Sequence, residues 1–442
     1  MNTAQWLEKG ASMLRPSGKA GVRSTQERLK GALRHDDEAM SPRQLRRLLD
    51  QLKGIVDPLL SEVEGGSRAQ SLMAWYAKAT PPERRDLWLL MSEQFVADAE
   101  QIKSAQAQFA AAVGTPDEAA AEVLYRRATV SPRRRILQRF SAHPEGIRFL
   151  VDVRAEMQPH LKADKRLHAL DVEMEYMFST WFDVGFLELR RISWDSPASL
   201  VEKLIKYEAV HDIRSWADVK NRLDGDRRCY GFFHPRLPEE PLIFVEVALM
   251  NEIADCITPL LDEEAAPVDI SKATTAIFYS ISNTQNGLRG VSFGDSLIKR
   301  VVETLHQEFP KLKVFVTLSP IPGLRSWLNK HAPAELLKSW ENLEQLTEAA
   351  PERKALLGWA ARYLGKEMQG GKPLDPVARF HLGNGARVER LNWGGDPSNK
   401  GSKQSYGLMV NYLYDLKRLE KHRAWLAQGK IPIAAAIEDL YL

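Results

Sequence analysis

Ser319 is a candidate for a side chain that acts on a substrate. It follows an apolar run that predicts a strand, and Pro320 and Pro322 come directly after it. Because proline fixes the backbone φ angle, these prolines stiffen the loop and can hold the serine hydroxyl in one place. From the local sequence alone, a turn or capping serine is the simpler interpretation. No Gly-x-Ser-x-Gly motif surrounds Ser319, so nothing indicates a covalent acyl-enzyme.

His381 is the second candidate. It is one of ten histidines, and it stands beside Phe380 and ahead of the segment Gly383–Gly385. A glycine-bearing turn of this kind can present an imidazole to a cleft. A histidine whose pKa lies near neutrality would suit proton transfer at such a place. The alternative interpretation is a structural histidine.

A glycine-containing loop, Arg289-Gly-Val-Ser-Phe-Gly294, precedes a predicted helix. Glycine lets the backbone approach a ligand closely, and the unpaired N–H groups of a helix's first turn point at whatever binds there. The loop is similar to the Arg-Gly-x-Gly-x-Gly pyrophosphate loop of GNAT acyltransferases, with Ser292 in place of the middle glycine. The alternative is an ordinary turn between a strand and a helix.

The loop and Ser319 belong to a predicted strand–loop–helix–strand unit. The apolar run Ala276–Ile281 predicts the first strand, and Val314–Leu318 predicts the second. Between them, apolar residues recur at helical period from Leu297 to Leu305. Further along, Ala386–Leu391 is β-like, and Tyr406–Leu416 is apolar and could form a strand or a helix.

Before about residue 190 the sequence predicts helices. Three helix starts place a hydroxyl residue before proline and a Glu or Gln at the third helical position: Ser41–Gln44, Thr80–Glu83 and Thr115–Glu118. A long apolar-rich helix is predicted from about Leu167 to Ile192. Short β-type runs begin near Arg228. The predicted fold class is therefore α and α/β, with an all-helical N-terminal domain followed by a mixed-sheet domain.

Length and composition limit the class of protein. A chain of 442 residues is expected to form two domains, and 44% hydrophobic and 27% charged residues are typical of a soluble globular protein. The net charge of +3 does not demand a nucleic-acid partner, and no apolar run reaches a membrane span. Cys229 and Cys256 fit neither a disulfide framework nor a zinc motif. The N-terminus has no signal-peptide core. Residues 1–34 are mildly basic, as in a transit peptide, but Glu8 and Glu27 argue against one, so a cytoplasmic location is expected.

Longer words in the sequence resemble malonyl-CoA decarboxylases. They are NTQNGLRGV, LIKRVV, FPKLKVF, LSPIPG, FHLGNGARVERLNWGGD and SYGLMVNYLYDL, within Phe232–Leu416. In that family the Ser of LSPIPG and the His of FHL-x-NGA are the catalytic pair, with Ser usually described as acceptor and His as donor. The resemblance assigns these roles to Ser319 and His381. It also implies a helical domain at residues 1–190, thought to mediate oligomerisation, and a GNAT-like, CoA-binding catalytic domain at 191–442.

The resemblance implies a binding site for the CoA thioester as well. Its expected residues are Arg289, Gly290, Val291, Ser292, Phe293, Gly294, Asp295, Asn384 and Tyr406. The implied reaction converts malonyl-CoA to acetyl-CoA and CO2 through a thioester enolate, which needs oriented hydrogen-bond donors and a proton at C2. No metal or other cofactor is expected, because the CoA thioester is itself the electron sink.

Two other functions remain open from the sequence. A GNAT-type acyltransferase would move an acyl group from CoA to an amine, and it would need an acceptor cleft and a base. A non-catalytic CoA-binding protein would need neither Ser319 nor His381. The expected partner is malonyl-CoA, with no nucleic acid and no membrane, and the family and the apolar helices of the N-terminal domain suggest a homodimer or homotetramer.

Overall fold

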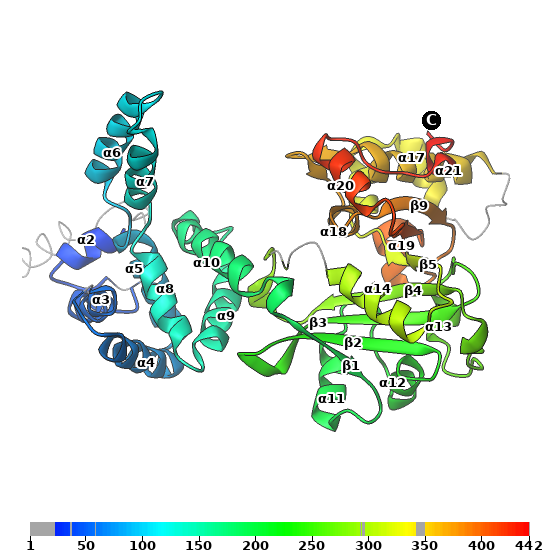
Figure 1. The fold of residues 1–442 in the computed structure, drawn as a ribbon, viewed down its shortest axis with the longest axis horizontal. Helices are drawn as coiled ribbons and strands as arrows, with labels where there is room; N and C mark the ends of the chain where they lie inside the picture. The colour runs from blue at the N-terminus through cyan, green and yellow to red at the C-terminus, as the bar shows by residue number, and fades with distance from the viewer. Residues whose placement is uncertain are drawn as a thin grey trace, which may run out of the picture. The chain divides into compact units, whose positions relative to one another are not determined.

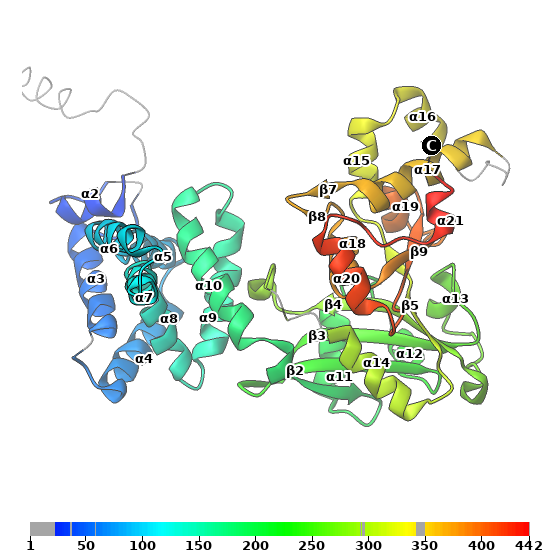
Figure 2. The same cartoon turned by 45° about the horizontal axis from the view of Figure 1, so that its top comes forward.

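The structure is a computed structural model of the chain, and it describes residues 23–35, 38–57, 59–291, 293, 297–341 and 350–441 (Figure 1, Figure 2). The chain divides into two compact units between Met177 and Phe178, whereas the sequence predicts the change near residue 190. The prediction of a long helix that reaches Ile192 was wrong. The helix ends at Trp181, and Asp183 then caps a short 3₁₀ turn that leads into a strand at Glu188–Ile192.

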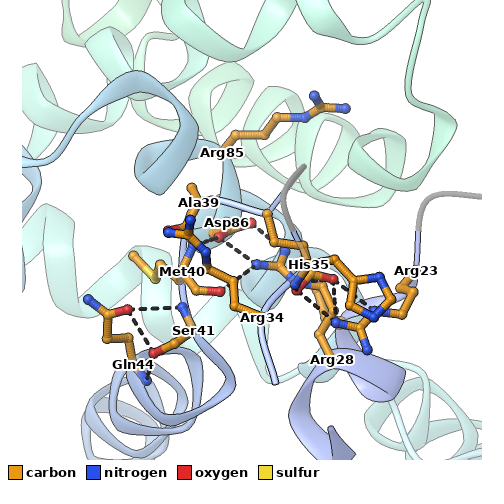
Figure 3. Close-up of polar contacts among 12 residues, drawn as sticks. Arg23, Arg28, Arg34, His35, Ala39, Met40, Ser41, Gln44, Arg85 and Asp86 are labelled. Carbon is orange, nitrogen blue, oxygen red and sulfur yellow. Dashed lines mark hydrogen bonds and ion pairs between the residues drawn. The ribbon is translucent and has the colours of Figure 1, made fainter. Parts of the chain in front are cut away.

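The first unit is helical in the part that the structure describes. Its helices are α2 (Thr25–Lys30), α3 (Pro42–Val56), α4 (Glu62–Lys78), α5 (Pro81–Gln94), α6 (Ala99–Ala112), α7 (Glu118–Ala128), α8 (Arg133–Ala142), α9 (Gly146–Met157) and the first part of α10 (His168–Trp181). Two of the predicted capping boxes are confirmed. Ser41 and Gln44 bond reciprocally at the start of α3 (Figure 3), and the Glu83 carboxylate accepts from the Thr80 N–H at 2.8 Å.

The third predicted helix start was wrong. Helix α7 begins at Glu118, three residues after Thr115. The Thr115 hydroxyl donates instead to the Ala112 carbonyl at 2.7 Å, at the end of α6, and the Glu118 carboxylate accepts from the Gly114 N–H. Thr115 therefore completes the preceding helix rather than opening the next one, which is a second use of the same hydroxyl chemistry.

A buried ion pair links α2 to α5 in the helical unit (Figure 3). Arg28 donates to both carboxylate oxygens of Asp86, at 2.5 and 2.8 Å, and the Met40 N–H donates to the same carboxylate at 3.2 Å. Removing one partner of such a buried pair typically costs about 3–5 kcal/mol, because the other charge is left unpaired. This contact fixes how the first helix and the segment before α3 dock onto α5.

The second unit is organised around a mixed sheet. In the described chain it has eight strands in the order β1-β2-β3-β4-β5-β10-β6, and β9 also pairs with β10. The strands are β1 (Glu188–Ile192), β2 (Arg227–His234), β3 (Leu237–Met250), β4 (Thr275–Asn283), β5 (Val314–Thr317), β6 (Ser319–Pro320), β9 (Arg387–Asn392) and β10 (Met409–Leu413). The pairing of β4 with β5 is parallel, and the other pairings of this sheet are antiparallel.

The second unit also contains helices in the described ranges. They are α11 (Ala198–Tyr207), α12 (Trp216–Arg222), α13 (Thr258–Leu261), α14 (Leu297–Glu308), α15 (Leu324–His331), α16 (Ala334–Ser339), α17 (Pro351–Lys366), α18 (Pro376–Gly383), α19 (Asn399–Ser405), α20 (Leu419–Ala427) and α21 (Ala435–Glu438). A short hairpin, β7 (Met368–Gln369) with β8 (Lys372–Pro373), precedes α18.

Contacts place two of these helices, α11 and α14, on opposite faces of the sheet. Leu204 of α11 packs with Cys229 of β2 in one apolar cluster. On α14, Arg300 lies over the Phe232 ring and Glu308 accepts from Arg228. Because successive strand residues point to opposite faces, Arg228 and Phe232 lie on the face opposite Cys229. Helix α14 is the connection in the chain from β4 to the parallel strand β5. It therefore packs on the face of the sheet opposite to Cys229.

Strands β4 and β5 separate part-way along their length. Their parallel pairing covers Thr275–Phe278 against Val314–Thr317, and the Leu318 N–H makes a last bond to the Phe278 carbonyl at 2.9 Å. Within the described residues, β4 continues without a β5 partner to Asn283. The separation leaves backbone N–H and C=O groups of the outer half of β4 without a β5 partner. Ser319 lies next to the point of separation.

The predicted fold class is confirmed: a helical region is followed by a mixed-sheet unit with a β4–α14–β5 crossover, as expected for a GNAT-like domain. The predicted strands and helix of this crossover match β4, α14 and β5, and Tyr406–Leu416 contributes a strand, β10. No helix in the described ranges is long and apolar enough to cross a bilayer.

Candidate active site

Ser319 and His381 are in direct contact. The Ser319 Oγ lies 3.2 Å from His381 Nε2, although the two residues are far apart in the sequence. Ser319 begins β6, where its backbone pairs with Val410 of β10, and its hydroxyl donates to Thr317 Oγ1 at 2.9 Å. The end of β5 and the start of β6 thus hold the serine hydroxyl, and α18 supplies the histidine.

His381 lies on a helix, whereas the sequence predicted a turn. Asp375 caps α18 by accepting from the Val377 and Ala378 N–H groups, and Pro376 occupies the first helical position. Both are favourable at a helix start, so the helix forms upstream of the glycines that follow His381. The predicted glycine-bearing turn comes only after Gly383, at the end of α18.

Tyrosines from β10 and the segment after it enclose the imidazole. The Tyr414 hydroxyl lies 2.7 Å from His381 Nδ1, and the Tyr412 ring stacks on the imidazole at 4.8 Å between centroids. Burial among these rings lowers the pKa of His381 to about 3, because removal from water disfavours the imidazolium. The expectation of a near-neutral pKa was therefore wrong.

The hydrogen bonds define a consistent proton arrangement. The Ser319 hydroxyl donates to Thr317, so its oxygen is free to accept from His381 Nε2–H. A neutral imidazole that carries its proton on Nε2 has an acceptor at Nδ1. The Tyr414 hydroxyl is placed to donate to that acceptor. The resulting chain of donors runs from Tyr414 through His381 and Ser319 to Thr317.

Asp375 also connects the serine segment to the histidine segment. Its Oδ2 accepts from the Gly323 N–H at 3.3 Å and from the Tyr363 hydroxyl at 3.3 Å. Gly323 ends the Ser319–Gly323 loop, and Asp375 starts the helix that carries His381. One buried carboxylate therefore fixes the separation of the two candidate catalytic side chains.

A cavity of about 830 Å³ opens beside this pair. One wall is the outer part of β4, where Ser280, Ile281 and Asn283 have no β5 partner in the described chain. Val291, Phe293 and Leu297 continue that wall toward α14, and the β7–β8 hairpin with α18 forms the opposite wall. Ser319 and His381 are 5% and 4% exposed, so they lie at the buried end of the cavity.

The predicted CoA-binding residues are only partly brought together. Val291, Phe293 and Asn384 line the cavity, and Gly290 has a φ of 84°, a conformation that favours glycine. Arg289 precedes this wall and is not among the lining residues. Ser292, Gly294 and Asp295 lie outside the described residues.

Of the two other predicted CoA-binding residues, Asn384 lines the cavity and Tyr406 does not. The Asn384 amide donates to the Phe380 carbonyl at 2.8 Å, and its Oδ1 is buried without a hydrogen-bond partner in the described structure. A buried acceptor at a cavity wall is suited to a ligand's N–H group. Tyr406 does not line the cavity. Its ring lies under the Arg325 guanidinium at 4.3 Å and against Trp340.

Thr317, Tyr414 and Asp375 were missed from the sequence. The pair Asp375–Pro376 has the residue types of a helix cap followed by its first position, and that signal could have been found. Thr317 lies only two residues before Ser319, but no local motif marks it, and Tyr414 contacts His381 of α18 from the segment after β10. In the described chain, no three His, Cys, Asp or Glu side chains gather in a way that could hold a metal ion.

Comparison with models of known protein families assigns the chain to a family. The family model described as the malonyl-CoA decarboxylase C-terminal domain matches residues 185–442, more than half of the chain. The chain belongs to the malonyl-CoA decarboxylase family. The N-terminal domain model of the same family matches residues 95–182. Relatives in this family are named as decarboxylases, which are carboxy-lyases.

Individual malonyl-CoA decarboxylases give the same result. The mitochondrial malonyl-CoA decarboxylase of Anser anser anser is 38% identical, and the alignment spans 65% of this chain and 65% of that protein. The crystal structure of malonyl-CoA decarboxylase from Rhodopseudomonas palustris matches with a TM-score of 0.80 and 41% identity, covering 89% of this chain and 99% of that chain. The enzyme from Cupriavidus metallidurans matches with 0.72 and 43%, covering 90% and 100%.

Proposed function

We propose that this protein decarboxylates malonyl-CoA to acetyl-CoA and CO2. The observation that carries the proposal is the contact between Ser319 and His381 at the buried end of a cavity, where β5 separates from β4. Membership of the malonyl-CoA decarboxylase family supports it.

The open edge of β4 suits the pantetheine arm of CoA. Pantetheine carries amide groups, and an extended chain can pair with the unpaired backbone N–H and C=O groups of a sheet edge. The buried Oδ1 of Asn384 offers a further acceptor for an amide N–H. In this arrangement the phosphates lie toward the loop before α14, and the acyl group reaches Ser319 and His381.

The chemistry requires stabilisation of a developing enolate. The bond between C2 and the carboxyl carbon breaks, CO2 leaves, and the electron pair spreads over C2 and the thioester oxygen. Hydrogen-bond donors that are already oriented stabilise this charge better than water does. We assign to Ser319 the task of holding the carboxylate out of the thioester plane, so that the breaking bond aligns with the π system. For this its hydroxyl turns from Thr317 to donate to a carboxylate oxygen when the substrate is bound. The thioester accepts the electron pair, and no further cofactor is required by this route.

Protonation of C2 completes the reaction. We assign the donor to Nε2–H of the neutral His381 imidazole, and Tyr414 passes its proton to Nδ1 as the Nε2 proton leaves. A proton from solvent then returns to Nε2 and the Nδ1 proton goes back to Tyr414, which restores the starting tautomer. A neutral imidazole serves as an electrophilic donor in other enzymes that form enolates. The negative charge of the malonyl carboxylate thus passes to the enolate, then to the donor chain, and is removed by a proton from water.

The first test is incubation of the purified protein with malonyl-CoA alone and with an added amine. We expect acetyl-CoA and CO2 in equal amounts, with no dependence on the amine. Malonylation of the amine would support an acyltransferase instead. CoA binding without product would support a non-catalytic protein, and either result would overturn the proposal.

Substitution of each member of the pair tests the assigned roles. We expect His381→Ala to lower kcat by about 10²–10⁴-fold, the usual contribution of a positioned proton-transfer group. We expect Ser319→Ala, which removes a group that orients the substrate, to lower kcat by about 10²-fold. The unfolding transition measured by circular dichroism should remain cooperative in both. A variant with the wild-type kcat would remove that residue from the mechanism.

We also propose that the helical unit assembles copies of the chain into a homodimer or homotetramer. Apolar side chains on its described surface support this, including Leu124 of α7 and Val172 of α10, which are 49% and 58% exposed. Apolar surface on a helical unit is commonly covered in an assembly.

A further inference from the structure

The described residues that line the cavity beside Ser319 and His381 include positively charged side chains but no negatively charged ones. Lys372 and Arg379 line it, and no aspartate or glutamate is among its described lining residues. A cavity whose wall carries cations without carboxylates attracts an anion and lowers the free energy of its bound state. Neither cation was singled out by the sequence motifs.

The two cations come from β8 and α18, which lie side by side (Figure 2). Lys372 lies in β8 of the short hairpin, and Arg379 lies on α18. The Arg379 Nε donates to the Pro373 carbonyl at 3.1 Å, which ties the guanidinium to the hairpin and leaves its terminal nitrogens for another acceptor. Within the described ranges, neither side chain forms an ion pair with a carboxylate.

Their place in the cavity distinguishes them from the reacting end. Ser319 and His381 are buried, whereas Lys372 and Arg379 are exposed. Residues that are two apart on a helix do not face each other, so Arg379 and His381 leave α18 in different directions. An anion held by Arg379 and Lys372 is therefore not the carboxylate that reacts beside His381.

We propose that Lys372 and Arg379 bind phosphate groups of the CoA moiety at the solvent side of the cavity. They would face the wall of Val291, Phe293 and Leu297, so that the phosphates lie between that wall and the β7–β8 hairpin. Arginine and lysine are both suited to phosphate, and arginine can contact two phosphate oxygens at once. The inference rests on the proposed function, since it takes a CoA thioester as the ligand.

Direct binding of CoA tests the inference without catalysis. Titration calorimetry would compare the full-length wild type with Lys372→Ala, Arg379→Ala and the double variant, using CoA and pantetheine as probes. We expect the double variant to bind CoA about tenfold more weakly or worse, because two charge-assisted contacts are lost. Pantetheine, which has no phosphate, should bind equally to wild type and variants.

A matched control removes the same charge elsewhere. Lys338 and Lys417 are exposed residues of the same unit that do not line the cavity. The double variant Lys338→Ala, Lys417→Ala should bind CoA like the wild type. Equal weakening in both double variants would mean that overall charge, not a site, governs binding, and it would overturn the inference. Lys372→Arg should retain CoA affinity and guards against a folding artefact.

Turnover then separates the phosphates from the malonyl carboxylate. With malonyl-CoA, we expect the Lys372→Ala, Arg379→Ala variant to raise KM about tenfold with little change in kcat. With malonyl-N-acetylcysteamine, a thioester without phosphates, wild type and variant should be equal. A lower kcat on the truncated thioester would place the cations at the reacting carboxylate and overturn the inference.

Failure of the inference and failure of the proposed function are distinguishable. A wild type that binds CoA and releases CO2, with variants of unchanged affinity, would overturn the inference alone. A wild type that binds CoA tightly but releases no CO2 would overturn the decarboxylase proposal, and the binding titrations would still decide the role of Lys372 and Arg379. No CoA binding by the wild type would overturn both.

Discussion

At the scale of single residues, the site depends on which atom donates in each hydrogen bond. The Ser319 hydroxyl donates to Thr317, and this leaves its oxygen available to His381. A serine hydroxyl without that acceptor would be free to turn toward Nε2 and donate to it. Thr317, which also accepts from the Tyr412 N–H at 3.1 Å, therefore selects one orientation of the Ser319 hydroxyl.

Thr317→Val tests this selection, because valine has nearly the shape of threonine without the hydroxyl. We expect kcat with malonyl-CoA to fall about tenfold with little change in KM, and a stability loss of about 1–3 kcal/mol from the unpaired Tyr412 N–H. Steady-state kinetics and urea unfolding would measure the two effects. Thr304→Val on α14, whose hydroxyl donates to the Arg300 carbonyl, is the control. An unchanged kcat in Thr317→Val would refute the role.

The pKa of His381 leads to a prediction on pH dependence. Burial lowers this pKa to about 3, so the imidazole is neutral at any pH above that value. We expect no break near pH 6.5 in the profile of kcat/KM for malonyl-CoA, which reports groups of the free enzyme. A break there that disappears in His381→Gln would contradict the neutral-imidazole mechanism.

The same pKa links His381 to stability. In the unfolded chain a histidine binds a proton below about pH 6.5, whereas the folded site does not until about pH 3. Between these values protonation favours the unfolded state, so the contribution of His381 falls as pH decreases, by at most about 1.4 kcal/mol per pH unit. The free energy of unfolding should therefore depend less on pH, between 6.5 and 4.5, in His381→Gln. Equal slopes in the variant and the wild type would contradict this linkage.

At the scale of elements, the start of α18 sets the distance between Ser319 and His381. Asp375 holds the Gly323 backbone and the Tyr363 hydroxyl while it caps the helix. Gly323 is needed here because a Cβ at this position would lie 2.1 Å from the Tyr363 hydroxyl oxygen. A glycine therefore lets the loop of Ser319 approach the start of α18 without displacing the Tyr363 hydroxyl.

Gly323→Ala should destabilise the protein by about 1–3 kcal/mol, since the methyl group overpacks this contact. Tyr363→Phe removes the clashing oxygen, so the double variant should be more stable than Gly323→Ala. Thermal unfolding and kcat would be measured for all three. Gly225→Ala is the control, because no described atom lies within 4 Å of the place that its methyl group would take. A double variant no more stable than Gly323→Ala would show that the Tyr363 hydroxyl is not the obstacle.

At the scale of the whole molecule, we propose different tasks for the helical unit and the mixed-sheet unit. The described residues that line the cavity beside Ser319 and His381 come from the second unit, in the range from Val210 to Leu426. A change on the surface of the helical unit should thus alter assembly without altering the chemistry of the site.

Leu124→Asp tests the assembly proposal, since a charge on an exposed apolar position of α7 is costly if another copy covers it. We expect light scattering after size exclusion to show a smaller assembly than the wild type, with kcat per chain within about twofold. Gln51→Asp, which introduces the same charge at an exposed polar position of α3, should leave the mass unchanged. Wild-type mass in Leu124→Asp would exclude this part of α7 from the interface.

The sequence by itself determined the fold class and the pair of catalytic candidates. Apolar runs of strand period and the helical period of Leu297–Leu305 predicted β4, α14 and β5, because burial of one face leaves a periodic signature in a contiguous segment. Ser319 and His381 were predicted as a catalytic pair because the segments around them resemble those of a known family. The local sequence alone favoured a structural role for each.

Only the tertiary structure decided the surroundings of that pair. Thr317, Tyr414 and Asp375 reach the site from separate elements, and the pKa of His381 follows from burial by rings that lie more than thirty positions away along the chain. Lys372 and Arg379 face the cavity only because a hairpin docks on α18. Hydrogen bonding and desolvation depend on distance in space, which a local sequence pattern does not encode.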